Sequence, residues 1–210
     1  MKKGTKKYLF FEIAFTGILI GLMFAFSFTV LGMIPLGVAS ATTVFIPVAI
    51  GIVCLDDFKF TGILGLGFGL ASFFRAMAPA GALDPFFINP MVSIVPRILA
   101  ALLAHLIFRL TSKVIKNRYV NAGICGGMMA FCNTLFVIPS LIIFNYKELG
   151  EILSGWSMSW QHFLLTGIIL TNMIPEILVG AVITLIVFIA LYKSFLQREE
   201  EVLEANEVVE

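Results

Sequence analysis

The chain has 210 residues, of which 60% are apolar and 13% are charged, and its mean hydropathy is +1.02. An average soluble domain carries about 25% charged residues. The chain therefore has too little polar surface for a water-soluble enzyme, and it is too apolar to be disordered. The formal net charge of +1 gives no reason to expect a nucleic-acid partner.

Six apolar stretches are long enough to cross a bilayer, for which about 20 mainly apolar residues are needed. In chain order they are residues 8–31, 34–55, 60–77, 91–110, 119–145 and 166–192. Pro35 and Gly37 mark the turn between the first two stretches, and a Pro/Gly-rich loop over residues 78–90 follows the third. We therefore predict an all-α integral membrane protein with six transmembrane helices. Residues 1–198 form its single domain, and residues 199–210 form an acidic tail.

The distribution of Lys and Arg over the short loops predicts the orientation. With the N-terminus inside, only Lys147 lies in an outer loop, against eleven basic residues on the inner side. The eleven are Lys2, Lys3, Lys6, Lys7, Lys59, Arg109, Lys113, Lys116, Arg118, Lys193 and Arg198. Both termini are therefore predicted to be cytoplasmic. A cleaved signal peptide ending at residues 39–41 is the alternative, but its apolar run would be about twice the usual 7–15 residues.

No motif of a nucleotide-binding or hydrolytic site is present in the sequence. The pattern G-x-x-x-x-G-K-[ST] is absent, so any ATP-driven step must use another protein, and H-E-x-x-H and G-x-S-x-G are absent too. His105 and His162 are far from each other and from the three cysteines, which lie in apolar stretches. We therefore expect a protein that is not an enzyme and that holds no metal ion or cofactor.

Polar residues inside apolar stretches are costly in lipid and usually face the interior of a helix bundle or a cavity. Here they gather toward the predicted outer ends. Arg97 lies about six residues, or about 9 Å, below the outer end of its helix, and Asn172 and Glu176 are i and i+4 neighbours. This asymmetry predicts a pocket open to the outside rather than a continuous pore. The predicted site residues are Arg75, Phe87, Asn89, Arg97, Asn133, Trp156, Asn172 and Glu176.

The charges in the spans predict an anionic organic ligand of moderate size. Arg75 and Arg97 face a single carboxylate, Glu176, so one arginine is left for a ligand carboxylate, which a guanidinium can bind with two hydrogen bonds. Two alternatives stay open at this point. Arg97 and Glu176 could form a purely structural ion pair, and Trp156 and Trp160 could belong to the aromatic belt at the membrane surface.

Small residues recur on one face of the first, third and fifth predicted helices, at a spacing that lets helix backbones approach closely in lipid. On the first helix they are Gly17, Gly21 and Ala25. Packing within the bundle accounts for the third and fifth helices. For the first helix, docking of a second membrane protein is an equally good interpretation.

Three segments carry a more specific pattern. They are TTVFIPVAIG at residues 42–51, GILGLGFGL at residues 62–70, and Asn89-Pro90 followed by VPRIL at residues 95–99. Together they resemble the S components of energy-coupling factor (ECF) vitamin transporters, nearest the subgroup that includes pantothenate carriers. The resemblance runs through about residues 42–108, and the rest of the chain agrees with the family in topology.

The resemblance implies a mechanism. An S component binds its vitamin from outside with high affinity, associates with a membrane scaffold protein (the T subunit) and two cytoplasmic ATPases, and topples in the membrane to expose the ligand inward. In the family, small residues on the first helix contact the scaffold, so Gly17, Gly21 and Ala25 are the matching candidates. The family's motif is alanine-based, whereas this chain has mostly Gly. After the second helix, DDFK at residues 56–59 replaces the family's Gly-Pro turn.

Pantothenate is the expected ligand, because it is a monoanion that suits one arginine and its dimethyl group suits Phe86, Phe87 or Trp156. Riboflavin, folate and other vitamins remain alternatives, because S components share a fold without sharing a ligand. A stand-alone secondary transporter and a membrane-embedded enzyme, such as a lipid-modifying transferase, are alternatives of another class. Uptake that needs ATP and partner subunits, uptake driven by an ion gradient, and turnover of lipid would distinguish the three.

Overall fold

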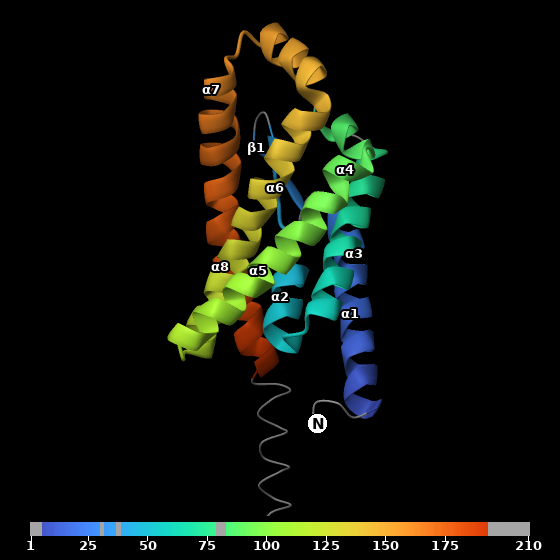
Figure 1. Ribbon diagram of the computed structural model, residues 1–210, viewed down its shortest axis with the longest axis vertical. Helices are drawn as coiled ribbons and strands as arrows, with labels where there is room; N and C mark the ends of the chain where they lie inside the picture. The colour runs from blue at the N-terminus through green and yellow to red at the C-terminus, as the bar shows by residue number, and fades with distance from the viewer. Residues whose placement is uncertain (1–5, 30–31, 37–38, 79–82, 193–210) are drawn as a thin grey trace, which may run out of the picture.

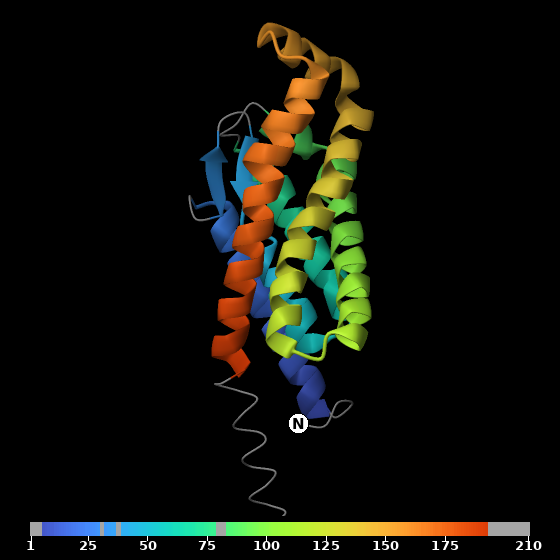
Figure 2. The ribbon, with the colours of Figure 1, turned by 90° about the vertical axis from the view of Figure 1, so that its left-hand side faces the viewer.

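The computed structural model describes residues 6–29, 32–36, 39–78 and 83–192. Its elements are, in chain order, α1 (Lys6–Ser27), β1 (Met33–Leu36), β2 (Ala39–Thr42), α2 (Ile46–Leu55), α3 (Phe58–Ala76), η1 (Asp84–Ile88), α4 (Pro90–Ser93), α5 (Val95–Val114), α6 (Arg118–Gly155), α7 (Trp160–His162), η2 (Phe163–Met173) and α8 (Ile174–Leu191). The long helices run beside one another along the long axis of one bundle (Figure 1, Figure 2). The acidic tail predicted at residues 199–210 lies outside the described residues.

Four helical segments are long and apolar enough to cross a membrane. They cover Tyr8–Ser27, Pro90–Val114, Arg118–Gly155 and Trp160–Leu191. Helices α2 and α3, with 10 and 19 residues, stand at the positions of the second and third predicted spans. Apart from the short helix η1, the described part of the chain thus has six helical segments in the predicted order, if α4–α5 and α7–η2–α8 are each counted as one. The helical fold class is confirmed.

The helix predicted over residues 34–55 is wrong in its first part. Strands β1 (Met33–Leu36) and β2 (Ala39–Thr42) pair there in antiparallel fashion, and α2 follows with only 10 residues. Pro35 has no N–H to donate within a helix, and Thr42, the last residue of β2, is β-branched and fits a strand better than a helix. The apolar composition alone does not separate a short strand from a helix.

Helix α6 is longer than the fifth predicted span, which was expected to end at Asn145. The backbone of Asn145, with φ −135° and ψ 32°, is not helical and kinks α6 there. The predicted end of the span therefore coincides with the kink, and the remainder of α6 extends to the upper end of the bundle in Figure 1. There Leu149, Leu153 and Phe163 join a small apolar cluster.

The two ends of the bundle differ in composition. The lower end in Figure 1 holds the first and last described residues, the α2–α3 turn and the α5–α6 connection. These segments carry the basic residues Lys59, Lys113, Lys116 and Arg118. The upper end holds the hairpin, η1, α4 and α7. The main apolar core joins α1, α2, α3, α5 and α6 between these ends.

A polar cluster at the lower end ties the α2–α3 turn to α5. The ring nitrogens of His105 lie 3.0 Å from Asp56 Oδ1 and 2.7 Å from Thr61 Oγ1, and Arg109 Nε donates to Asp56 Oδ1 at 2.8 Å. The ring of Phe58 stacks on His105 with ring centres 4.0 Å apart. Burial disfavours the ionised form of Asp56, but the hydrogen bonds and charges of Arg109 and His105 outweigh it and hold the pKa of Asp56 below its ordinary value.

Candidate ligand-binding cavity

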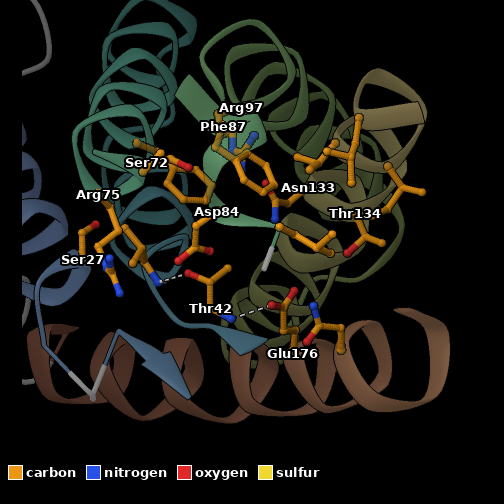
Figure 3. A pocket seen from close by; sticks show the side chains of 18 of the residues that line it. Ser27, Thr42, Ser72, Arg75, Asp84, Phe87, Arg97, Asn133, Thr134 and Glu176 are labelled. Atoms are coloured by element: carbon orange, nitrogen blue, oxygen red, sulfur yellow. Dashed lines mark hydrogen bonds between the residues drawn. The ribbon is translucent and has the colours of Figure 1, made fainter. Parts of the chain in front are cut away.

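A cavity of about 120 Å³ lies between the helices in the upper half of the bundle (Figure 3). Its wall is formed by the end of α1, the end of β2, and residues of α3, η1, α5, α6, η2 and α8. Six of the eight predicted site residues lie in this wall, namely Arg75, Phe87, Arg97, Asn133, Asn172 and Glu176. Much of the remaining wall is apolar, with Phe68, Val137 and Leu141 among its residues. A few polar groups on an apolar lining are typical of a small-molecule site.

Arg97 is the buried cation of the cavity. It lies in the first turn of α5 and is only 6% exposed, and its Nη1 donates to the carbonyl oxygen of Val92. The rings of Phe87 and Phe68 lie over the guanidinium, with centres 4.8 and 5.8 Å from its carbon. Its Nε has no hydrogen-bond partner among the described residues. A buried donor without a partner costs free energy, so a ligand carboxylate that accepts from Nε would be stabilised here.

Glu176 lies in the first turn of α8 and is 4% exposed. Its Oε1 accepts a hydrogen bond of 2.6 Å from the backbone N–H of Thr42, which holds the end of β2 against α8 (Figure 3). No ion pair joins Glu176 to Arg97 among the residues that the structure describes. The structural ion pair considered from the sequence is therefore not formed.

Two asparagines add neutral polar groups to the wall. Asn133 in α6 is 6% exposed, and its Oδ1 lacks a hydrogen-bond partner within the residues that the structure describes. Asn172 lies in η2, four residues before Glu176, so both face the same cavity. The segment η2 is a π-helix, a rare form that is frequent at functional sites. Pro175, which has no backbone N–H, stands just after it in the first turn of α8.

The cavity wall contains a second carboxylate that the charge count from the sequence left out. Asp84, the first residue of η1, lies in the wall with Arg75 from the last turn of α3. Arg75 Nη1 donates to the carbonyl oxygen of Ala78. The wall therefore contains two arginines and two carboxyl groups, rather than two arginines and Glu176 alone.

Two of the predicted site residues lie outside the cavity wall. The side chain of Asn89 caps α4, because its Oδ1 accepts from the backbone N–H of Met91 at 3.0 Å. Trp156 ends α6 at the upper end of the bundle and is 41% exposed. Its neighbour Trp160 stacks on Tyr146, with ring centres 5.1 Å apart.

Several polar wall residues were missed from the sequence, namely Ser27, Thr42, Ser72 and Thr134. Serine and threonine are common in transmembrane helices, so their presence alone gives little signal. The sequence signal that could have identified Thr42 is the pair of threonines, Thr42 and Thr43, at the start of an otherwise apolar stretch.

Below the cavity the bundle is closed by direct backbone contact between α6 and α8. A Cβ atom added to Gly126 would lie 2.1 Å from the carbonyl oxygen of Gly180, which is one turn below Glu176. A Cβ atom on Gly180 would lie 2.7 Å from the ring of Phe45, a fully buried residue at the start of α2. Only glycine permits this approach, so no ligand-sized space lies at the crossing.

The small-residue face of α1 is not used in the bundle. Gly17, Gly21 and Ala25 are all exposed, and a Cβ atom on Gly17 or Gly21 would meet no atom of the described residues within 4 Å. By contrast, a Cβ atom on Gly65 of α3 would lie 2.9 Å from the backbone of α5. Gly65 is thus a packing residue of the bundle, whereas the face of α1 is unoccupied by the described residues.

Comparison with known proteins gives two relatives. The pantothenate transporter PanT of Leuconostoc mesenteroides is 30% identical over 168 residues, which cover 71% of this chain and 82% of that protein. The pantothenic acid transporter PanT of Lactococcus lactis is 28% identical over 169 residues, which cover 73% of this chain and 78% of that protein. No family model matches the chain.

Proposed function

This chain belongs to the family of the pantothenate transporters PanT, within the S components of ECF vitamin transporters, and we propose that it binds pantothenate from outside the cell and delivers it to an ATP-driven transport complex. It is a multi-pass protein of the bacterial cell membrane and a vitamin transporter. The observation that carries the proposal is Arg97, a buried cation in the wall of a cavity whose Nε has no hydrogen-bond partner among the described residues.

The polar groups of the cavity match the chemistry of pantothenate. Pantothenate carries one carboxylate, one amide, two hydroxyls and a dimethyl group. The carboxylate would accept from Arg97, and the hydroxyls and amide would donate to Asn133 Oδ1 and to the carboxylate of Glu176. The dimethyl group would lie against Phe87 and Val137. These groups thus suit an anion that also carries donors.

The cavity is small for its proposed ligand. Its volume of about 120 Å³ compares with roughly 300 Å³ or more for ordinary small-molecule sites. The bound state therefore needs the wall to move outward. We expect this movement at the hairpin and η1, because they are short elements at the upper end and lie outside the tightly packed crossing of α6 and α8.

We infer that the lower end of the bundle faces the cytoplasm. The α2–α3 turn and the α5–α6 connection carry Lys59, Lys113, Lys116 and Arg118, and basic residues in short loops favour the cytoplasmic side. The cavity then opens toward the exterior, and both termini are cytoplasmic. Residues 1–198 act as one domain.

Energy coupling is assigned to separate subunits, because the sequence has no phosphate-binding loop. The exposed face of α1 formed by Gly17, Gly21 and Ala25 is the proposed contact with the T subunit, and two ATPases complete the complex. Small residues let a partner helix approach closely.

The test has two parts. Purified chain should bind pantothenate in calorimetry without any partner, and proteoliposomes should take up labelled pantothenate only when the T subunit, both ATPases and ATP are present. Uptake by the chain alone under an ion gradient would instead make it a secondary transporter. Binding of riboflavin or folate in place of pantothenate would move it to another branch of the same family.

A further inference from the structure

The charged groups of the cavity differ in their surroundings. Arg97 is covered by Phe87 and Phe68, whereas Glu176 is held at the backbone of Thr42. In Figure 3, Asp84 and Glu176 both point into the space that Arg97 borders. An occupant therefore meets a cation on one side and carboxylates elsewhere in the same small cavity.

We propose that Asp84 and Glu176 restrict the cavity to monoanionic acids whose other polar groups are hydrogen-bond donors, and that they exclude ligands with a second anionic group. This inference rests on the proposed function of the same cavity. It assigns Asp84 a role in specificity that neither its position in the sequence nor the family resemblance indicated.

The balance of charges supports a single negative charge on the ligand. The wall holds two arginine and two carboxyl side chains, so it has no arginine in excess of its carboxyl groups before a ligand arrives. A ligand carboxylate takes up the buried cation, Arg97. Arg75 is half-buried at the end of α3, lies in the same wall as Asp84, and donates to the carbonyl of Ala78. A second anion on the ligand would therefore share the wall with two carboxyl groups and find no arginine in excess of them.

The same carboxylates favour uncharged donors. An ionised carboxylate can only accept hydrogen bonds, so hydroxyl and N–H groups are its proper partners. Pantothenate meets this requirement, because its carboxylate and its terminal hydroxyl lie at opposite ends. Esterifying that hydroxyl with phosphate, as in 4′-phosphopantothenate, replaces a donor by a group with a charge of about −1.5 to −2 at pH 7. Like charges brought together in a binding site strongly weaken binding of the ligand that carries them.

Calorimetric titration of the purified full chain with pantothenate and with 4′-phosphopantothenate tests the inference. We expect the ester to bind at least about 100-fold more weakly. The variants Asp84→Asn and Glu176→Gln keep the size of each side chain and remove its carboxylate. Glu176→Gln also keeps a side-chain oxygen that can accept the hydrogen bond from the backbone N–H of Thr42. In each variant, the preference for pantothenate over 4′-phosphopantothenate should be about tenfold smaller than in the wild type. Asp57→Asn removes a carboxylate at the lower end, where the side chain of Asp57 caps α3, and should leave the ratio unchanged.

Three results would overturn the inference. The ester could bind as tightly as pantothenate, or the ratio could stay the same in both Asp84→Asn and Glu176→Gln although their melting temperatures show that they fold. Arg75→Gln could also weaken binding of the ester alone, which would assign the second anion to Arg75. Because the two variants are independent, misfolding of one leaves the other as the test.

A result that rejects pantothenate as the ligand can be distinguished from a result that rejects the charge rule. If pantothenate does not bind, the chain is titrated with thiamine (a cation), riboflavin (neutral), biotin and nicotinate (monoanions), and folate (a dianion). Binding of a monoanion alone would reject pantothenate and uphold the charge rule. Binding of a neutral, cationic or dianionic vitamin, or of none of them, would overturn the charge rule as well.

Discussion

Replacing Arg97 by Met should abolish most ligand binding and leave the unliganded chain folded. The side chain is 6% exposed and no ion pair joins it to Glu176 among the described residues, so in the bound state a ligand carboxylate is its natural counter-ion. Losing one partner of a buried, hydrogen-bonded charge pair costs about 2–5 kcal/mol. At about 1.4 kcal/mol per tenfold, this predicts an affinity loss of roughly 30- to 4,000-fold.

Arg97→Lys separates charge from geometry. Lysine keeps the positive charge but loses the planar fork and the stacking on Phe87, whose ring centre is 4.8 Å from the guanidinium carbon. We expect a loss of about tenfold to 100-fold, between wild type and Arg97→Met, because cation–π contacts at desolvated sites contribute up to about 2 kcal/mol.

The measurement is calorimetric titration of pantothenate into purified variants, with thermal melting of the unliganded chain alongside. Lys113→Met is the matched control, since it removes a cation from the same helix, α5, at the opposite end of the bundle. The role assigned to Arg97 is refuted if Arg97→Met melts like wild type and binds pantothenate within threefold of wild type.

Three further outcomes follow from other parts of the bundle. Gly126→Ala should lower the melting temperature through overpacking of about 1–3 kcal/mol, because its Cβ would lie 2.1 Å from the carbonyl oxygen of Gly180, whereas Gly17→Ala meets no described atom within 4 Å and should melt like wild type. Since the pKa of Asp56 is lowered from 3.8, its stabilising contact with Arg109 is present above that pH and is lost as the pH falls through the lowered pKa. Asp56→Asn should therefore show a flatter acid limb in melting temperature against pH, and an unchanged limb would contradict this. Gly17→Leu should leave pantothenate binding by the isolated chain intact but reduce ATP-driven uptake by the complete complex; normal uptake would remove α1 as the docking face.

The positions of the helices could be predicted because apolar stretches of sufficient length have few alternatives in a membrane. The hairpin could not be predicted in the same way. Its residues, from Met33 to Thr42, are nearly as apolar as a membrane helix, and only Pro35 contradicts helical structure strongly. The extension of α6 beyond Asn145 was missed because the sequence there mixes charged and apolar residues, as amphipathic surface helices do.

Most of the predicted site residues lie in the cavity wall, and the reason that the sequence could indicate them is different. A charged or amide side chain within a span has to avoid lipid, so Arg97, Asn133 and Glu176 had few places other than the interior. Asn89 lies in a connection, where local capping competes with ligand binding, and capping the short α4 is what its side chain does. The contact between Thr42 and Glu176 joins residues 134 positions apart, and no local pattern can indicate such a pair.

The packing below the cavity limits how a ligand could reach the cytoplasm. Passage between α6 and α8 would require their backbones to separate at Gly126 and Gly180, where they are in direct contact, and would also displace the fully buried Phe45. Such a separation would lose van der Waals contacts between the two helices. Because helix association in a bilayer depends on these contacts, the lipid would not compensate for the loss. Reorienting the bundle as a rigid body keeps these contacts and moves the whole cavity instead. This agrees with the toppling that the resemblance to S components implies, and the face of α1 proposed to contact the T subunit is exposed, as such a motion beside a second membrane protein requires.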